Sequence, residues 1–225
     1  MTKFPRSLAL LAGLLLGATA AVAQGWPAKP ITLMVGFPPG GQTDFAGRVL
    51  MSSMQTTLGQ PVVIDNKAGV NGNLAAVEVL KAPPDGQKLL VGNGSMTISQ
   101  HFYTKLGMID PRQLTPIGVM LQSSLVLAVP ATSPIKTYAQ FADEVKARAK
   151  AGKSIDYGTG GAGSLVHVTM ELLRERMGGP TINHVPYKGL APAISDLLGG
   201  QIDLVVDAGV SLPHLRTGKL KLLAV

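Results

Sequence analysis

Two glycine-rich stretches carry the residue pattern best suited to chemistry in this chain. The first is Phe37-Pro38-Pro39-Gly40-Gly41-Gln42-Thr43-Asp44, and the second runs from Gly158 to Ser164. Each follows a short apolar run and precedes a stretch with helical spacing. The first N–H groups of a helix have no partner within the helix, and the helix dipole favours negative charge there. Because glycines let an anion approach such groups, the two turns predict a small-anion site held from both sides.

The same glycines could serve only to fit tight turns between strands and helices, and the sequence leaves that alternative open. Neither stretch matches the G-x-x-x-x-G-K-[ST] pattern of a nucleotide phosphate loop. The run Gly158-x-Gly160-Gly161-x-Gly163 approaches the dinucleotide-binding fingerprint, but no acidic residue lies at the distance that this pattern requires. Nucleotide binding is therefore not expected.

Ser164 and His167 suggest a nucleophile and its base, because they lie three residues apart on one expected helix face. The G-x-S-x-G pattern of serine hydrolases is absent, and two residues on one helix rarely have the geometry of a catalytic triad. We therefore expect no catalytic residue, and we interpret Ser164 as a helix cap or an anion donor. A secreted serine hydrolase using Ser164 is kept as an alternative function.

The remaining titratable residues give weaker indications. The four histidines, His101, His167, His184 and His214, lack the spacing of metal ligands, so we expect neither a metal site nor a cofactor. Asp207 falls at the carboxyl end of an expected strand, where ligands bind in open α/β sheets. It could receive a ligand amine or hydroxyl, or simply cap a loop.

The composition of the 225 residues excludes several protein classes. With 46% hydrophobic and 15% charged residues, the chain is not a disordered tail. The absence of cysteine excludes a disulfide scaffold, a Cys-ligated zinc site, a thiol nucleophile and a lipid-anchored N-terminal cysteine. The length allows one large domain or two small ones.

Residues 1–23 have the pattern of a cleavable export signal. Lys3 and Arg6 precede an apolar run of about 15 residues, which is short of the ~20 that span a bilayer. Ala21-Val22-Ala23 fits a cleavage site, so we expect cleavage after Ala23. The mature chain then keeps 18 basic and 13 acidic residues, a formal charge of +5. This modest charge, without an RNA-binding aromatic pattern, argues against nucleic acid as a partner.

Short apolar runs alternate with helical stretches along the mature chain. The first hundred residues predict a parallel sheet, with strands at 31–37, 61–64 and 88–91 and helices at 43–58 and 73–81. The second half repeats the alternation, with strands at 125–129, 154–158, 184–187, 202–206 and 220–225 and helices at 137–151, 165–177, 189–198 and 212–216. The alternation predicts two α/β halves that meet near residues 120–130.

An ordered set of motifs resembles the Bug family, the extracytoplasmic solute receptors of tripartite tricarboxylate transporters. The set covers the whole mature chain, and its order is more specific than any single string. The matching strings are Trp26-Pro27-Ala28-Lys29-Pro30-Ile31, Phe37-Pro38-Pro39-Gly40-Gly41, Leu58-Gly59-Gln60-Pro61-Val62-Val63, Pro84-Asp85-Gly86, Tyr157 through His167, His184 through Gly189, Asp196-Leu197-Leu198-Gly199-Gly200 and Gly218-Lys219-Leu220.

The resemblance implies an α/β, two-lobed type II periplasmic-binding-protein (Venus-flytrap) fold in the periplasm. The ligand would be a small organic carboxylate, the partners membrane transporter subunits, and the receptor a monomer. A ligand-sensing partner of a membrane signalling protein would share the same cleft and is a further alternative. Residues 24–125 would form lobe 1 and residues 126–225 lobe 2, with hinge strands near 126–130 and 220–225. Family members extend well past these residues, so lobe 1 is expected to lack its C-terminal return, as in a truncated chain, and to be less stable.

The resemblance also assigns ligand-binding residues. The first clamp would be Phe37, Gly40, Gly41, Thr43 and Asp44, and the second Gly160, Gly161, Ala162, Gly163, Ser164 and His167. Asp207 would select the distal end of the ligand. Asn93 and Ser95, in a third loop at a strand end, could also contact it.

Overall fold

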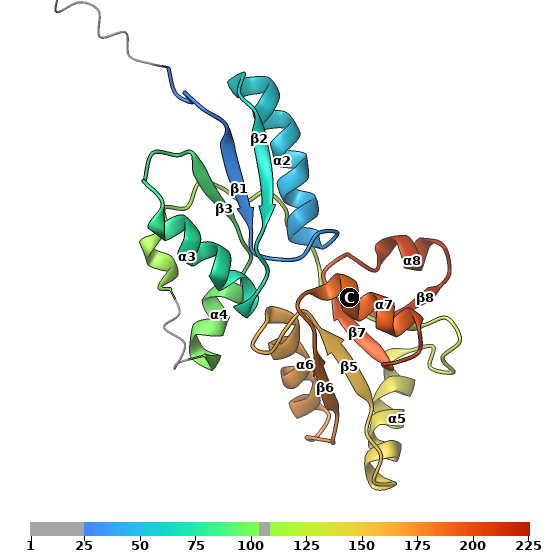
Figure 1. Cartoon of the computed structure of the whole chain (residues 1–225). Coiled ribbons are helices and arrows are strands. Elements are labelled where there is room, and N and C mark those ends of the chain that lie inside the picture. Colours follow the sequence, from blue (N-terminus) through green and yellow to red (C-terminus); the bar gives the residue numbers. More distant parts are fainter. Residues whose placement is uncertain (1–24, 104–108) are drawn as a thin grey trace, which may run out of the picture.

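Two α/β lobes make up the computed structural model, which describes residues 25–103 and 109–225 (Figure 1). Lobe 1 runs from blue to green in the figure, and lobe 2 runs from yellow to red. Residues 1–23, with the predicted cleavage site after Ala23, lie outside the described part of the chain. Among the described residues, no helix combines the length and apolar character needed to cross a membrane.

Lobe 1 contains a three-stranded parallel sheet of order β2-β1-β3. Its strands are β1 (Ile31–Val35), β2 (Val62–Asn66) and β3 (Lys88–Val91). Its helices are α2 (Gln42–Leu58), α3 (Asn73–Lys81) and α4 (Ser95–Phe102), with short 3-10 turns η2 (Val70–Gly72) and η3 (Pro111–Gln113). Helix α2 covers one face of the sheet and α3 the other (Figure 1). This arrangement brings the carboxyl ends of all three strands toward lobe 2.

The central strand of lobe 1 is buried because helices cover both of its faces. Ile31, Leu33 and Val35 have no exposed surface and pack with the apolar side of α2. Gly47 allows the close approach of α2, since a Cβ there would lie 3.2 Å from a methyl carbon of Val35. The start of α2 is thereby fixed at the carboxyl end of β1.

Lobe 2 contains a five-stranded mixed sheet of order β6-β5-β7-β4-β8. Its strands are β4 (Val126–Pro130), β5 (Asp156–Thr159), β6 (Asn183–Pro186), β7 (Leu204–Asp207) and β8 (Leu220–Ala224). Its helices are α5 (Tyr138–Lys150), α6 (Leu165–Arg176), α7 (Leu190–Leu198) and α8 (Leu212–Arg216). Strands β5, β6 and β7 are parallel, whereas β4 runs antiparallel to both β7 and β8.

Lobe 2 has an apolar core on each face of its sheet. Leu127 and Val129 face a cluster that contains Phe141 of α5 and Met170 of α6. Ala128, between them on β4, faces the second cluster beneath α7. This alternation along β4 follows from the opposite directions of successive side chains in a strand.

The α/β class and the two lobes are confirmed, and three details differ from the sequence prediction. Helix α4 was not predicted, and the sheet of lobe 2 is mixed rather than a repeat of the parallel first sheet. The predicted hinge strands near 126–130 and 220–225 are β4 and β8, which pair with each other in the sheet of lobe 2. The chain passes between the lobes in the segment before β4, residues 114–125, outside any helix or strand.

Candidate ligand-binding cleft

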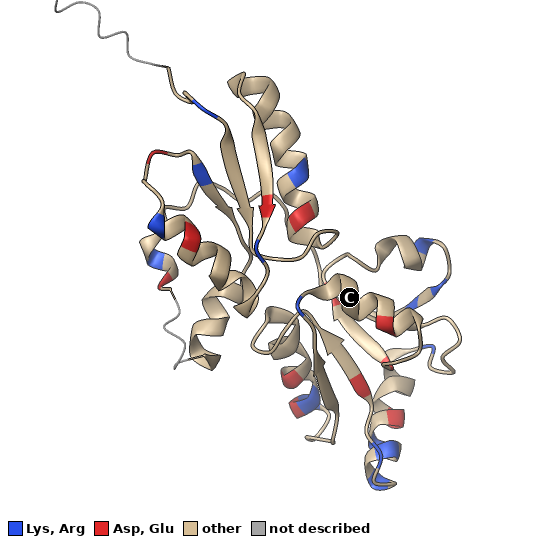
Figure 2. Cartoon of the chain, viewed as in Figure 1, with Lys and Arg blue, Asp and Glu red and all other residues tan. Residues whose placement is uncertain are grey.

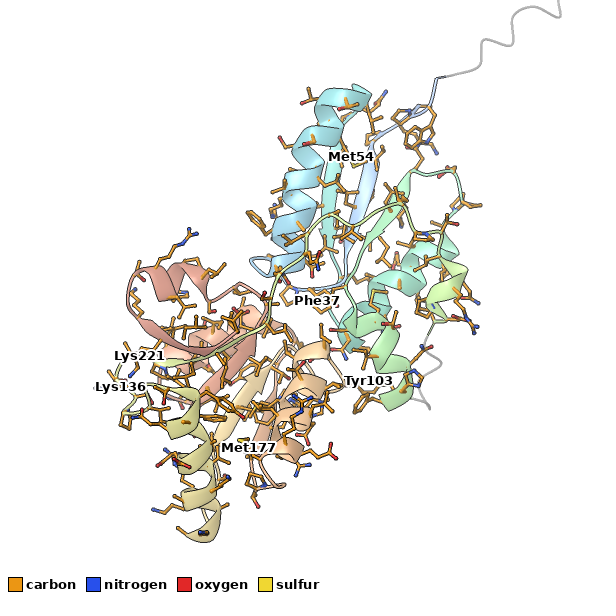
Figure 3. All side chains as sticks on the ribbon, turned by 180° about the vertical axis from the view of Figure 1, so that it is seen from behind. Phe37, Met54, Tyr103, Lys136, Met177 and Lys221 are labelled. Atoms are coloured by element: carbon orange, nitrogen blue, oxygen red, sulfur yellow. The ribbon has the colours of Figure 1, made fainter. Side chains whose placement is uncertain are left out.

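A cavity of about 130 Å³ lies between the lobes, and both lobes contribute to its lining. Lobe 1 supplies Phe37, Gly41 and Thr43 from the first glycine-rich turn and the start of α2. It also supplies Asn93 and Ser95 from the loop that precedes α4 and the start of that helix. Figure 3 shows Phe37 at the end of lobe 1 that faces lobe 2. The small volume suits a small molecule.

Lobe 2 contributes the opposite side of the cavity from two strand-to-helix turns. Gly160 and Ser164 come from the second glycine-rich turn, with Leu165 from the first residue of α6. Gly189 and Leu190 come from the turn that precedes α7 and from its first residue. The turn at Gly189 was not predicted as part of the site, although its position between a strand and a helix repeats the pattern of the other turns.

Four helices begin at this cavity. The first residues of α2, α4, α6 and α7, namely Gln42, Ser95, Leu165 and Leu190, all belong to the lining. The N-terminus of a helix carries a partial positive charge and N–H groups without intrahelical acceptors. The cavity therefore lies at four positive helix ends, two from each lobe.

No charged side chain lines the cavity within the described part of the chain. The polar lining groups are neutral hydroxyls and amides, including those of Gln42, Thr43, Asn93, Ser95 and Ser164. An anion in this position would be held by hydrogen bonds and helix dipoles instead of by ion pairs. An ammonium group would meet no carboxylate.

Asp44 shapes the first turn instead of lining the cavity. It is 3% exposed, and its carboxylate accepts hydrogen bonds from Gly40 N (3.0 Å), Arg48 Nε (2.9 Å) and Asn66 Nδ2 (3.0 Å). Burial raises the pKa of Asp44, but these hydrogen bonds outweigh burial and leave the pKa below its usual value. The ionised carboxylate thus ties Gly40 to both α2 and β2.

His167 supports the second turn from behind. Its Nδ1 accepts a hydrogen bond from Gly163 N (3.0 Å), and its backbone N–H donates to Ser164 Oγ (3.3 Å). Ser164 is therefore the N-cap of α6, as the sequence suggested. The ring nitrogen engages a backbone N–H and not the serine hydroxyl, which is not the geometry of a nucleophile and its base.

The rings of His167 and His184 stack on each other beneath this turn. Their centroids are 4.0 Å apart with an interplanar angle of 11°, and the Tyr157 ring stacks against both, 5.0 Å from His184 and 6.5 Å from His167. Burial lowers the pKa of His167, and it lowers the pKa of His184 to about 4, with a contribution from the neighbouring His167. Both imidazoles are therefore neutral near pH 7.

Asp207, which the resemblance assigns to the distal end of the ligand, is not among the residues that line the cavity. Its side chain has no exposed surface, and its carboxylate accepts from Gly209 N (3.0 Å), Val210 N (3.1 Å), Ser211 N (2.7 Å) and Ser211 Oγ (2.6 Å). These four bonds hold the turn between β7 and α8, so the loop-capping alternative is the one observed.

The structure thus divides the predicted site residues into two groups. Those that line the cavity are Phe37, Gly41, Thr43, Asn93, Ser95, Gly160 and Ser164. Those that build the turns behind the lining are Gly40, Asp44, Gly161, Ala162, Gly163, His167 and Asp207. Contact between the first group and a ligand stays a prediction.

Two α/β lobes with a cavity at facing helix N-termini define a two-lobed solute-binding protein of the type II periplasmic class. Residues 46–225 match the family described as "Tripartite tricarboxylate transporter family receptor", and the chain belongs to this family. It is 35% identical to BugT of Bordetella pertussis over 207 residues, 90% of this chain and 62% of BugT. It is 37% identical over 219 residues to a Cupriavidus necator protein encoded in the gbd 5′ region, 96% of this chain and 65% of that protein.

Solved structures agree with this assignment. The periplasmic binding protein BugD superposes with a TM-score of 0.81 at 32% identity, over 88% of this chain and 66% of BugD. An R. palustris protein solved with adipate gives 0.83 at 34% identity, over 88% of this chain and 66% of that protein. MatC from Rhodopseudomonas palustris, solved with malate, gives 0.77 at 29% identity, over 88% of this chain and 67% of MatC. The chain spans less than two thirds of the length of the two sequence relatives described above.

Proposed function

We propose that this chain is a periplasmic receptor that binds a small organic carboxylate and delivers it to a tripartite membrane transporter. The observation that carries the proposal is the convergence of four helix N-termini on a cavity whose described lining holds no charged side chain. Helix N-termini favour anions through their dipoles and through N–H groups that have no acceptor within the helix. The ligands solved with two relatives, adipate and malate, support a carboxylate as that anion.

The same lining disfavours amino acids as ligands. An amino acid carries an ammonium group, and a buried ammonium without a carboxylate partner costs several kcal/mol. Asp44 and Asp207 are next in sequence to residues that line the cavity. Their carboxylates already accept hydrogen bonds from the turns that they hold. The substrate class is therefore carboxylates without an amino group.

Binding would proceed by closure of the lobes around the ligand. Groups from both lobes line one cavity, so a ligand that touches both favours the arrangement in which they lie close together. The crossing segment 114–125 lies outside helices and strands and can change its dihedral angles without disrupting either sheet.

A thermal-unfolding panel tests the proposal. The chain is melted with adipate, malate, succinate and glutamate, each over a range of concentrations. A ligand at about 100 times its dissociation constant adds about 2.7 kcal/mol, which is a rise in Tm of roughly 5–11 °C for a protein of this size. We expect such a rise with at least one of the three carboxylates and none with glutamate. A flat panel over a cooperative melt would contradict the proposal.

A matched pair of threonine variants then tests the cavity itself. Thr43 lines it from the first turn of α2, whereas Thr56, near the end of the same helix, bonds only to Ser52 O. Loss of one hydrogen bond at about 1 kcal/mol predicts that Thr43→Val raises the Kd about fivefold. Thr56→Val should leave the Kd unchanged in isothermal titration calorimetry. Equal effects of the two changes would place the ligand elsewhere.

A further inference from the structure

One backbone carbonyl of lobe 2 receives two side chains from lobe 1. Ala162 O accepts hydrogen bonds from Asn71 Nδ2 at 2.7 Å and from the Tyr103 hydroxyl at 2.9 Å. Asn71 belongs to η2, and Tyr103 directly follows α4. Figure 3 shows Tyr103 at the end of lobe 1 that faces lobe 2. The two donors use both lone pairs of the carbonyl, and none of the three residues lines the cavity.

The backbone that carries Asn71 is strained. Val70 and Asn71 have φ values of 47° and 53°, in the left-handed region that L-residues rarely adopt. For a β-branched valine this conformation is an outlier. Strain of this kind persists where the surrounding structure requires it, often at functional sites. Here it directs a side chain that is 6% exposed across the boundary between the lobes.

The second turn is shaped to receive lobe 1. Gly161 (φ 141°) and Gly163 (φ 68°) both have positive φ. A Cβ at Gly161 would lie 2.7 Å from Asn71 Oδ1, and a Cβ at Gly163 would lie 2.9 Å from Phe102 Cγ. A third direct bond joins Leu165 N to Ser95 Oγ at 3.1 Å. The glycines thus leave room for lobe 1 side chains as well as for the turn.

We propose that Asn71 and Tyr103 form a latch on the carbonyl of Ala162 that holds the lobes in their closed arrangement. Both are positioning residues, since they join protein to protein outside the cavity lining. The latch raises the affinity for ligand by increasing the population of the closed form. This effect on affinity rests on the proposed function. The effect on lobe arrangement does not depend on that function.

Distances between the lobes test the latch directly. Because the chain has no cysteine, spin labels can be placed at Ser53→Cys on α2 and Ala147→Cys on α5, both exposed and in different lobes. The latch variants are Asn71→Gly, which keeps the left-handed backbone and removes the amide, and Tyr103→Phe, which removes only the hydroxyl. Each lost hydrogen bond predicts a roughly 2- to 10-fold rise in the open-to-closed ratio, measured by double electron–electron resonance without added ligand.

Two control variants lose comparable groups that do not join the lobes. Asn183 bonds to Asp156 within lobe 2, and Tyr138 starts α5 on the surface of lobe 2. Asn183→Gly and Tyr138→Phe should leave the distance distribution unchanged. The latch is overturned if Asn71→Gly and Tyr103→Phe both give the distribution of the unaltered chain, or if that chain is already open in solution.

Adipate titration separates failure of the latch from failure of the proposed function. If the chain binds adipate, the latch variants should raise its Kd by up to the factor by which the closed population falls. A shift in distance with no binding of adipate, malate or succinate by any variant would keep the latch and reject the carboxylate receptor. A raised Kd with unchanged distances would reject the latch.

Discussion

The stacked rings of His167 and His184 connect the chemistry of two residues to the shape of the second glycine-rich turn. His167 Nδ1 accepts from Gly163 N, so it must be unprotonated for this bond to exist. His184 Nε2 lies 2.7 Å from the hydroxyl of Thr159, which in turn accepts from Gly161 N. Neutral imidazoles therefore hold two N–H groups of the turn in place.

Acidification should destabilise the protein between pH 6.5 and about 4. The pKa of His184 is about 4 in the folded state, below the 6.5 of an unfolded histidine, because of burial. Within this window the unfolded state binds more protons, so the free energy of unfolding falls as the pH falls. Urea titrations across this range measure the free energy of unfolding at each pH. His184→Gln should flatten the slope, whereas His101→Gln, on the exposed surface of α4, should not.

The groups around the two histidines do not reverse the sign of this pH dependence. Glu171 on α6 acts on both histidines, Tyr157 on β5 stacks against them, and Arg174 bonds to Glu171. Attraction to Glu171 raises the pKa of each histidine by less than burial lowers it. Glu171 itself has a lowered pKa, since hydrogen bonds from Arg174 and Tyr157 outweigh its burial, so its charged form is favoured. A slope that is unchanged in His184→Gln would contradict the role of the pair.

The sequence could predict which residues lie at the turns but not which of their atoms remain available. Thr43, Gly160 and Ser164 line the cavity, because a strand followed by glycines and a helix fixes where such residues lie. Asp44 and Asp207 were placed beside a ligand, but their oxygens accept bonds from backbone N–H groups. Sequence does not show which backbone N–H groups a fold turns toward a carboxylate.

At the scale of elements, one glycine allows the start of α7 to lie close to lobe 1 at the cavity. Gly189 precedes the helix with a φ of 145°, and a Cβ there would lie 2.7 Å from Cδ of Pro38 in lobe 1. The first turn of lobe 1 and the start of α7 thus approach as closely as they do because residue 189 has no side chain.

Gly189→Ala should therefore impair binding as well as cost stability, since a φ of 145° also disfavours any side chain. The added methyl group would push α7 away from lobe 1, and overpacking of 1–3 kcal/mol predicts a Kd raised about tenfold or more. Gly200, at the other end of α7, offers a matched control because its φ is 73° and a Cβ there would meet nothing within 4 Å. Gly200→Ala should cost stability from the positive φ but leave the Kd unchanged. Similar Kd values for the two variants would contradict the close approach.

Helix α4 shows where prediction of elements from sequence fails. Its residues Ser95–Phe102 include polar Thr97, Ser99 and Gln100, and they lack a continuous apolar face. The helix is held by tertiary contacts: Met96 is buried, and Ser99 Oγ accepts from Asn73 Nδ2 of α3 at 2.9 Å. The antiparallel direction of β4 was missed for a similar reason, because an apolar run such as Leu125–Val129 does not indicate the direction of its neighbours.

At the scale of the molecule, charge lies around the cavity and not within its described lining. Residues 24–225 hold 18 basic and 13 acidic residues. The basic residues at the end of α5 lie far from lobe 1 (Figure 2). Lys188 is exposed and precedes Gly189 at the edge of the cavity. Such a charge attracts an anion during approach without contacting it once bound.

Lys188→Gln should therefore slow association without changing dissociation. We expect the association rate constant for a dicarboxylate to fall roughly 2- to 3-fold at low salt, because a mutation of a peripheral charge acts mainly on the on-rate. Stopped-flow fluorescence with the single tryptophan or an attached dye measures both rates. Lys150→Gln, at the end of α5, is the control and should change neither rate. A faster dissociation in Lys188→Gln would mean that Lys188 contacts the bound ligand.

The order of strands in the two sheets also determines when each lobe can fold as the ribosome makes the chain. The described sheet of lobe 1 uses residues 31–91 and has all three strands once β3 has emerged. In lobe 2, the first strand made, β4, lies between β7 and β8, the last two strands of its sheet. Strand β4 therefore waits for residues 204–224 before it has both neighbours, and pairing over such separations is slow. A nascent chain halted after β4 would hold an assembled first sheet beside an unpaired apolar strand, which is a segment for a chaperone to cover.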